Sequence, residues 1–241
     1  MKKAEIVADQ IAQTIVGQRW EPGELFGSEV ELIARYGVSR AVFREAVRLL
    51  EHHSLAEMRR GLHGGLFIRQ PDPKPVAKAM AVYLDFEKVE PRQLEDARFA
   101  IEMVCVERAA ARISEDDVAE VRAFLAAEAA RIASGRAQSL YGFHVLVARL
   151  TANPALHLFV QTLTDLTQRQ QPIPDRSRRS LEEIHAAHIR IAEAIIARDG
   201  ALARHRMMTH LEDVSAAAAR RPPARAQRAE PTAARPVTAA G

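Results

Sequence analysis

A tight turn between two short helical patterns constrains the fold of the N-terminal part of this chain more than any other feature. The first pattern ends at Gly37, a residue suited to a helix C-terminus. Ser39 can cap a second helix almost at once. Apolar side chains recur along that second helix at i, i+3, i+4 and i+7, namely Phe43, Ala46, Val47 and Leu50. Two helices joined so closely are typical of a helix-turn-helix.

Three arginines line one side of the second helix. At about 100° per residue, Arg40, Arg44 and Arg48 fall within a band of about 80° beside the apolar stripe, so they project outward. An isolated stripe of this kind is usually a solvated face. An arginine fork can, however, donate two hydrogen bonds to guanine O6 and N7 when a helix enters the major groove of DNA. The turn before the stripe and the segment after it favour DNA binding.

The segment after this helix, "LAEMRRGLHGGLFIRQP", alternates loosely and is broken by glycines. It predicts a two-stranded hairpin whose basic, glycine-rich tip contains Arg59, Arg60 and Gly61. Another helical pattern runs from Lys3 to about Gly17, before the breakers of "EPGELFGSE". Three helices followed by a hairpin predict a winged helix-turn-helix DNA-binding domain over residues 1–72.

Strand signals disappear beyond "PDPKP", residues 71–75, which is typical of a linker. The expected helices lie near Val76–Phe86, Pro91–Ile113, Glu115–Ser134, Ser139–Leu150, Pro154–Gln170, Ser180–Arg198 and Asp199–Ala219. The chain is therefore expected to be mainly α, with an all-helical domain over residues 73–219. Residues 220–241 are rich in Ala, Pro and Arg and have too few large apolar side chains to bury a core, so they are predicted to be disordered.

Charge, cysteine content and hydropathy set broad limits. The net charge is +3, but residues 220–241 contain five arginines and one glutamate, so the rest of the chain carries −1. High pI is therefore a weak argument for nucleic-acid binding. The single cysteine, Cys105, excludes an intrachain disulfide and suits a buried position in a reducing compartment. No segment has the roughly 20 apolar residues of a spanning helix, and no signal peptide is evident, so we expect a cytoplasmic protein with no membrane partner.

The first 70 residues resemble the DNA-binding domain of the GntR family. The resemblance rests on a Pro-Gly, a Ser-Glu before the second helix, Val-Ser-Arg, Arg-Glu-Ala and a glycine-bearing wing, all within "PGELFGSEVELIARYGVSRAVFREAVRLLEHHSLAEMRRGLHGGLFI". It implies operator contacts by Arg40 and Arg44. We assign phosphate contacts to Ser39 and Arg48, and backbone or minor-groove contacts to the wing residues Arg59, Arg60 and Gly61. Val30 departs from family members that have a DNA-holding arginine at this position.

The helical remainder is similar to the effector domain of the FadR-like branch, called FCD. The similarity lies in "RFAIE" from Arg98, "FHVLVARLTANPAL" from Phe143, "HIRIAEAIIARD" from His188 and "MMTHL" ending at Leu211. It implies that His144, His188 and His210 bind a divalent metal ion, and neutral imidazoles suit Zn or Ni. His185 competes with His188 for this role. The aspartate that usually precedes the first histidine by four residues is here Leu140, so a metal-free polar pocket stays open as an alternative.

The same resemblance places Arg98 and Glu102 in the effector cavity, where Arg98 suits an acidic ligand because guanidinium binds carboxylate in a bidentate way. A surface salt bridge between the two is the simpler alternative. The expected protein is a homodimeric transcription regulator, a repressor rather than an enzyme, on a pseudo-palindromic operator, that senses a small acidic metabolite. Other possible functions are a regulator whose metal-free pocket takes an acyl-CoA or other acidic ligand, a metal-dependent enzyme fused to a DNA-binding domain, and a DNA-binding protein whose helical domain only dimerises.

Overall fold

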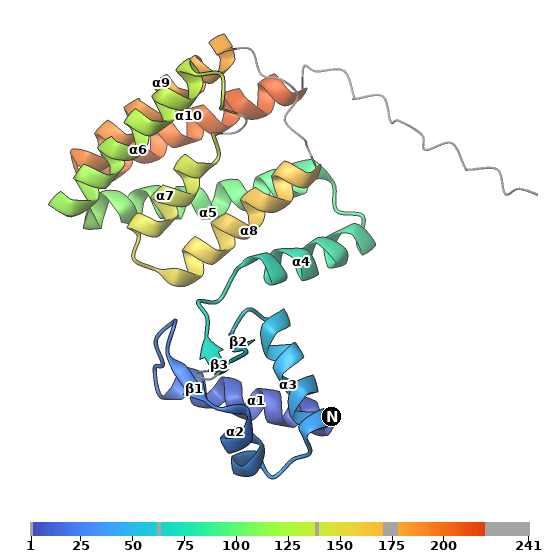
Figure 1. Ribbon diagram of the computed structural model, residues 1–241. Helices are drawn as coiled ribbons and strands as arrows, with labels where there is room; N and C mark the ends of the chain where they lie inside the picture. Colours follow the sequence, from blue (N-terminus) through green and yellow to red (C-terminus); the bar gives the residue numbers. More distant parts are fainter. Residues whose placement is uncertain (1, 62–63, 138–139, 171–177, 220–241) are drawn as a thin grey trace, which may run out of the picture.

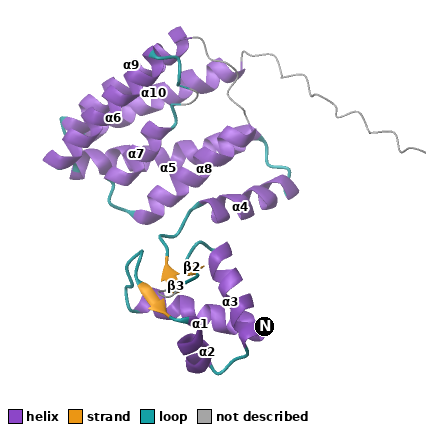
Figure 2. Cartoon of the chain, in the orientation of Figure 1, coloured by secondary structure: helices purple, strands orange, loops and turns teal. Residues whose placement is uncertain are grey.

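The computed structural model describes residues 2–61, 64–137, 140–170 and 178–219. Figure 1 shows a small N-terminal part with helices and a sheet, and a larger helical part, joined through the segment that leads into helix α4. Figure 2 shows that the strands occur only in the N-terminal part of the described chain. The structure confirms the predicted mainly α fold with an N-terminal winged helix-turn-helix. The predicted disordered tail, residues 220–241, lies outside the described residues.

The helix-turn-helix consists of α2 (Glu29–Tyr36) and α3 (Arg40–His52), with α1 (Lys3–Gly17) beside them. Ser28 caps α2, and its hydroxyl accepts a hydrogen bond from the backbone N–H of Glu31 at 3.3 Å. Gly37 ends α2 in the left-handed conformation, with φ of 59°. Ser39 then caps α3 by accepting from the N–H of Val42 at 3.3 Å. The turn is therefore built as the sequence predicts.

The sheet has one strand more than the sequence predicted. It consists of β1 (Leu25–Gly27), β2 (Ala56–Arg59) and β3 (Gly65–Ile68) in the antiparallel order β1-β3-β2. A Cβ on Gly65 would lie 2.6 Å from the carbonyl oxygen of Gly27, so glycine permits the close approach of β1 and β3. β1 was missed because its three residues lie among turn residues and have no periodicity of their own.

The core of the N-terminal part lies between α1, α3 and the sheet. The predicted apolar stripe of α3 is buried, as are Ile11 of α1 and Leu66 of β3. With this stripe packed inward, the opposite side of α3 remains in contact with solvent.

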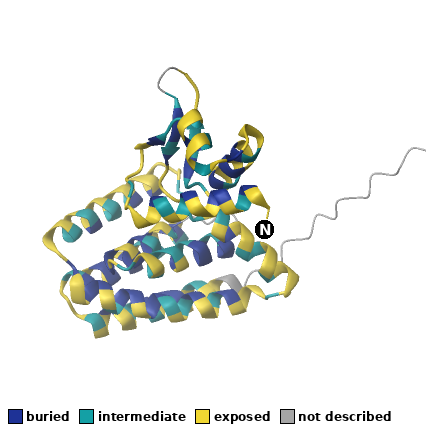
Figure 3. Ribbon diagram, turned by 90° about the horizontal axis from the view of Figure 1, so that it is seen from below, coloured by how far each residue is buried: buried dark blue, intermediate teal, exposed yellow. Residues whose placement is uncertain are grey.

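Among the described residues, seven helices form the larger part: α4 (Lys74–Phe86), α5 (Pro91–Arg112), α6 (Glu115–Ala133), α7 (Gly142–Leu150), α8 (Pro154–Gln170), α9 (Arg178–Ile196) and α10 (Gly200–Ala219). α5 packs against α7, α8, α9 and α10, and α6 packs against α9. Cys105 of α5 is buried in this core, as expected. Figure 3 shows buried and exposed residues alternating along these helices, as expected of helices that cover a shared core.

Side chains cap two helix starts in the larger part. Ser114 and Asp117 form a capping box at α6, with the Asp117 N–H donating to the Ser114 hydroxyl at 3.1 Å. The Asn153 side chain accepts hydrogen bonds from the N–H groups of Ala155 and Leu156 at the start of α8.

Two predicted boundaries change. α4 begins at Lys74, inside the predicted linker, because Pro75 lies in the first turn, where a missing N–H costs nothing. α7 begins at Gly142, later than predicted, and the predicted start Ser139 lies outside the described residues. No helix in the described part of the chain is both long enough and apolar enough to cross a membrane.

Candidate functional site

Three histidines from three helices meet inside the larger part. His144 of α7, His188 of α9 and His210 of α10 are 4%, 0% and 4% exposed. Each offers a ring nitrogen, and these three atoms all lie within 4.8 Å of one another. The rings of His144 and His210 stack at 5.3 Å, and the ring of His188 lies edge-on to that of His210 at 4.9 Å. The structure therefore brings together the predicted set, and this buried cluster could bind a metal ion.

A buried carboxylate orients His144. Glu102 Oε2 lies 2.7 Å from His144 Nδ1, and Glu102 Oε1 lies 2.8 Å from Arg98 Nε. Burial acts to raise the pKa of Glu102, but the charges of His144 and Arg98 outweigh it and hold this pKa below its ordinary value. An ionised carboxylate can only accept, so Nδ1 of His144 carries a proton toward Glu102, and Nε2 is the ring nitrogen left for another partner. This arrangement of carboxylate and imidazole is common behind metal-ligating histidines.

Arg98 and Glu102, predicted to contact the effector, form a buried ion pair on α5 rather than a surface salt bridge. The Arg98 guanidinium also lies over the ring of Tyr141, 5.0 Å from its centre. The structure thus places the pair directly behind His144. The contact of this pair with an effector stays a prediction.

Sequence reasoning missed a second carboxylate, Glu128 of α6, which is fully buried. Its Oε2 lies 3.0 Å from Nδ1 of His188 and 2.7 Å from Nδ1 of His185. Burial acts to raise the pKa of Glu128, but the bonds to the two histidines hold it below its ordinary value. A signal was present, because Glu128 stands at a helical position shared with buried Val121 and Ile132, where an apolar residue is expected.

His188 and His185 share Glu128 but differ in surroundings. His188 is completely buried, whereas the His185 side chain is 15% exposed and lies outside the three-histidine cluster. Nε2 of His188 is buried and has no hydrogen-bond partner, which is the condition expected of a nitrogen that faces a metal position. Burial lowers the pKa of His188 to about 4, so its imidazole is neutral near pH 7, as a metal ligand must be.

Leu140, at the position of the usual aspartate, lies just before α7 and is buried with Ile132 and Leu181 in a separate apolar cluster. It contributes no oxygen to the histidines. The donor set among the described residues is therefore three imidazoles, with carboxylates behind two of them. Such a set fits a divalent ion of the Zn or Ni type and leaves coordination positions for a further ligand.

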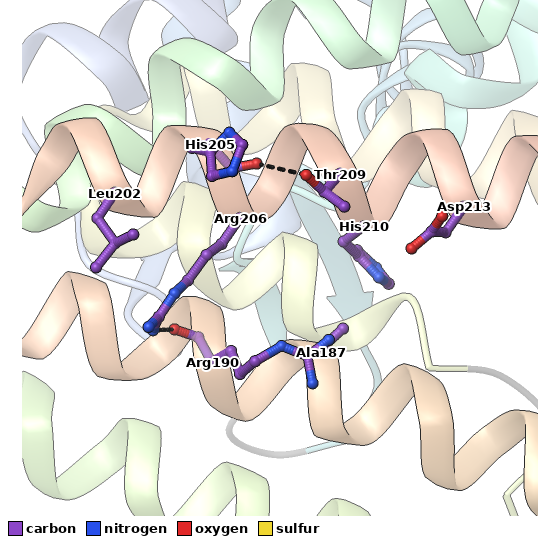
Figure 4. A pocket seen from close by; sticks show the side chains of 8 residues that line it. All are labelled: Ala187, Arg190, Leu202, His205, Arg206, Thr209, His210 and Asp213. Atoms are coloured by element: carbon purple, nitrogen blue, oxygen red, sulfur yellow. Dashed lines mark hydrogen bonds between the residues drawn. The ribbon is translucent and has the colours of Figure 1, made fainter.

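A hollow of about 260 Å³ lies between α9 and α10 (Figure 4). It is lined by Ala187, Arg190, Leu202, His205, Arg206, Thr209, His210 and Asp213. His210 belongs both to this hollow and to the histidine cluster. Two arginines and one aspartate give this lining a net positive charge, so this side of the cluster favours anions over cations.

The predicted DNA-reading residues lie on the exposed side of α3. Arg40 and Arg44 are 65% and 64% exposed, and both contact Glu29 of α2, at 3.7 Å and 3.1 Å from Nε. Glu29 belongs to the Ser-Glu on which the family resemblance partly rests, but sequence reasoning assigned it no role. Arg48 pairs with Glu45 at 3.0 Å. It does not pair with Glu51, which instead accepts a hydrogen bond from the N–H of Met58.

The wing presents its predicted residues at the end of β2. Arg59 pairs with Glu57 at 2.7 Å and lies over the ring of Phe67, 4.4 Å from its centre. Arg60 and Gly61 are exposed, and the next two residues, 62 and 63, lie outside the described part. Val30 is exposed beside the recognition helix. The DNA-contact roles stay predictions.

Comparison with known families matches both parts of the chain. Residues 3–66 match the model of bacterial regulatory proteins, gntR family, and residues 93–213 match the FCD domain. A GntR protein from Streptococcus agalactiae has a similar fold, with a TM-score of 0.67 at 23% identity over 88% of this chain and 98% of that one.

Curated relatives span both domains. The Uxu operon transcriptional regulator of Escherichia coli is 29% identical over 86% of this chain and 83% of its own length. The regulator LutR of Bacillus subtilis is 24% identical over 80% of this chain and 91% of its own length. The repressor NanR of Salmonella newport is 27% identical over 89% of this chain and 85% of its own length. These are transcription regulators, not enzymes, which confirms that expectation for this chain. The chain belongs to the gntR family of bacterial regulatory proteins, in the branch whose DNA-binding domain is followed by an FCD effector domain.

Proposed function

We propose that this regulator is a repressor whose FCD domain binds a metal ion at His144, His188 and His210 and, next to it, a small carboxylic acid that weakens operator binding. The observation that carries this proposal is the buried, carboxylate-oriented histidine cluster. A fold with a winged helix-turn-helix can place such a sensor in the same chain as the DNA-binding surface. The relative NanR is named a repressor, which favours repression.

The metal would be Zn or Ni, held by the three imidazoles, and would supply a Lewis-acidic site for an oxygen of the effector. Arg98 and Glu102 would border the effector. Arg98 supplies a guanidinium for a carboxylate, and Glu102 keeps His144 in the required tautomer. The basic hollow beside His210 supports an acidic ligand, an acyl-CoA included, whether or not metal is bound.

On DNA, Arg40 and Arg44 would read bases in the major groove from the exposed side of α3. Ser39 and Arg48 would contact phosphates, and Arg59, Arg60 and Gly61 of the wing would contact the adjacent backbone or minor groove. The working units are residues 1–72 for DNA and 73–219 for effector binding and dimerisation. The protein would act in the cytoplasm as a homodimer on a pseudo-palindromic operator.

Fluorescence anisotropy tests the DNA-reading assignment. An operator duplex is first obtained by in-vitro selection with the full-length protein. Arg40→Ala and Arg44→Ala should each weaken operator binding by about tenfold or more, since a bidentate base contact is worth about 1–3 kcal/mol. The matched control is Arg122→Ala, which removes an exposed arginine from α6, far from the recognition helix. If both recognition-helix variants bound as tightly as this control, the assignment would be wrong.

A further inference from the structure

Glu29, the first residue of α2, contacts both outward-facing arginines at the start of α3. Its Oε1 accepts a hydrogen bond from Arg44 Nε at 3.1 Å and lies 3.7 Å from Arg40 Nε. The glutamate side chain is 27% exposed, whereas both arginine side chains are about two-thirds exposed. A partly covered carboxylate therefore lies behind two exposed guanidinium groups.

This contact differs from the neighbouring ion pair of Arg48 and Glu45. That pair joins residues one turn apart on the same helix, and both of its side chains are more than half exposed. Glu29 instead joins α2 to α3 across the turn of the helix-turn-helix and serves two arginines at once. Exposed ion pairs contribute little to folding stability, so stability alone does not account for the shared carboxylate.

The position of the carboxylate decides which edge of each guanidinium is available. Arginine presents its N–H groups in a rigid fork. With Glu29 held at Nε of Arg44, the terminal Nη1 and Nη2 groups are left for a partner farther out, and such a pair of donors matches guanine O6 and N7. The negative charge of Glu29 also opposes close approach of a phosphate that offers no base contact in return.

We propose that Glu29 is a positioning residue that determines how well this regulator discriminates its operator from other DNA. It orients Arg44 and Arg40 toward the base edges, and its charge weakens binding to DNA that offers only phosphates. The inference rests on the proposed reading of the operator by these two arginines.

The test compares full-length Glu29→Ala and Glu29→Gln with the matched control Glu45→Ala, which removes the same charge from the same domain. Anisotropy gives Kd for the selected operator duplex and for a scrambled duplex of equal composition, at several KCl concentrations. Glu29→Ala should lower the ratio of scrambled to operator Kd by about tenfold, since the oriented base contacts supply discrimination of this size. Glu29→Gln keeps an acceptor without charge and should lower the ratio by about threefold. Glu45→Ala should tighten both duplexes alike and leave the ratio within about twofold.

An unchanged ratio in Glu29→Ala, or an equal fall in Glu45→Ala, would overturn the inference. Thermal melting shows whether each variant is folded. If Glu29→Ala is unfolded, the near-isosteric Glu29→Gln is used for the test, and an unchanged ratio of scrambled to operator Kd in that variant would also contradict the inference. The proposed function fails separately, through Arg40→Ala and Arg44→Ala that bind like wild type. The inference about Glu29 can be wrong even if Arg40→Ala and Arg44→Ala still weaken operator binding.

Discussion

At the residue scale, two buried carboxylates determine what the histidine cluster can do. Glu102 bonds to Nδ1 of His144, and Glu128 bonds to Nδ1 of His188. Because both carboxylates are ionised, Nδ1 of each histidine carries a proton toward its carboxylate. In His188 this leaves Nε2, which is buried and has no hydrogen-bond partner. Neither carboxylate replaces the aspartate absent at Leu140 as a ligand. They act instead by fixing tautomer and ring orientation.

His188 and His185 both bond to Glu128, so substituting each in turn gives a matched test of the metal site. Protein stripped with chelator and given Zn or Ni at about 100 times Kd should melt about 5–10 °C higher, since such binding adds about 2.7 kcal/mol to the free energy of unfolding. His188→Ala should lose this shift and the bound metal. His185→Ala removes the other histidine on Glu128 and should keep both. The measurements are thermal melting and elemental analysis.

Two results would contradict the three-histidine site. One is wild-type protein whose melting temperature does not respond to either metal. The other is that His185→Ala loses as much metal as His188→Ala does. That result would mean that Glu128 and its histidine partners matter only for folding.

At the element scale, α4 carries apolar side chains on two faces. Ala77, Met80, Ala81 and Leu84 face the other helices of the larger part, where α4 packs on α8. The other face leaves large apolar side chains exposed, namely Val76, Val82, Tyr83 and Phe86, the last of them 82% exposed. Such a face is typical of a protein–protein interface. Lys78 and Asp85 flank the same side of it two turns apart, so in an antiparallel pair of α4 helices Lys78 of one copy would face Asp85 of the other.

Charge reversal on α4 tests this surface as the dimer interface. Lys78→Glu should weaken dimerisation by about tenfold or more, because it sets like charges against each other across the two-fold axis. Adding Asp85→Lys to the same chain should restore the dimer, since the pair is then reversed. Sedimentation velocity over a concentration series measures the dimer Kd, and Arg122→Glu on α6 is the control for a reversed surface charge. If Lys78→Glu left the dimer Kd unchanged, the interface would lie elsewhere. A monomeric wild-type protein would contradict the predicted homodimer itself.

At the scale of the whole molecule, α4 and α5 connect the histidine cluster to the DNA-binding domain. α5 carries Arg98 and Glu102 to the back of His144, and α4 joins α5 to the segment that follows β3. In Figure 1 α4 lies on the side of the larger part that faces the N-terminal part. We therefore expect a ligand that shifts α5 to move α4 as well, and in the proposed dimer α4 would set the spacing of the two winged domains.

This arrangement predicts coupling between metal or effector and operator. Metal together with the correct acid should change operator affinity by about 5–150-fold, the range of typical coupling free energies, and operator DNA should change the affinity for the acid by the same factor. Anisotropy with and without Zn or Ni and a panel of carboxylates measures the first effect, and calorimetry measures the second. His188→Ala should bind the operator with an affinity that metal does not alter. Equal operator affinity in wild type under all these conditions would contradict the sensor.

Local signals in the sequence predicted much of this protein. Ser28, Gly37 and Ser39 set the helix-turn-helix because capping and turn chemistry depend on neighbours along the chain. The helices of the FCD domain followed from apolar periodicity, and the three histidines followed from resemblance to the family. Strand β1 was not predicted because its three residues are too few to show the alternating pattern of a strand.

Only the tertiary structure decided which groups stand behind the functional side chains. Glu128 meets His188 across 60 residues of sequence, Glu102 meets His144 across 42, and Glu29 meets Arg44 across 15. A glutamate on a helix has the same propensity whether it is solvated or buried, and its partner is chosen by how helices pack. The sequence by itself determined the helices, the turn and the histidines. Packing alone decided that two carboxylates would be buried beside imidazoles and a third would hold two arginines, because those contacts arise between elements and not within them.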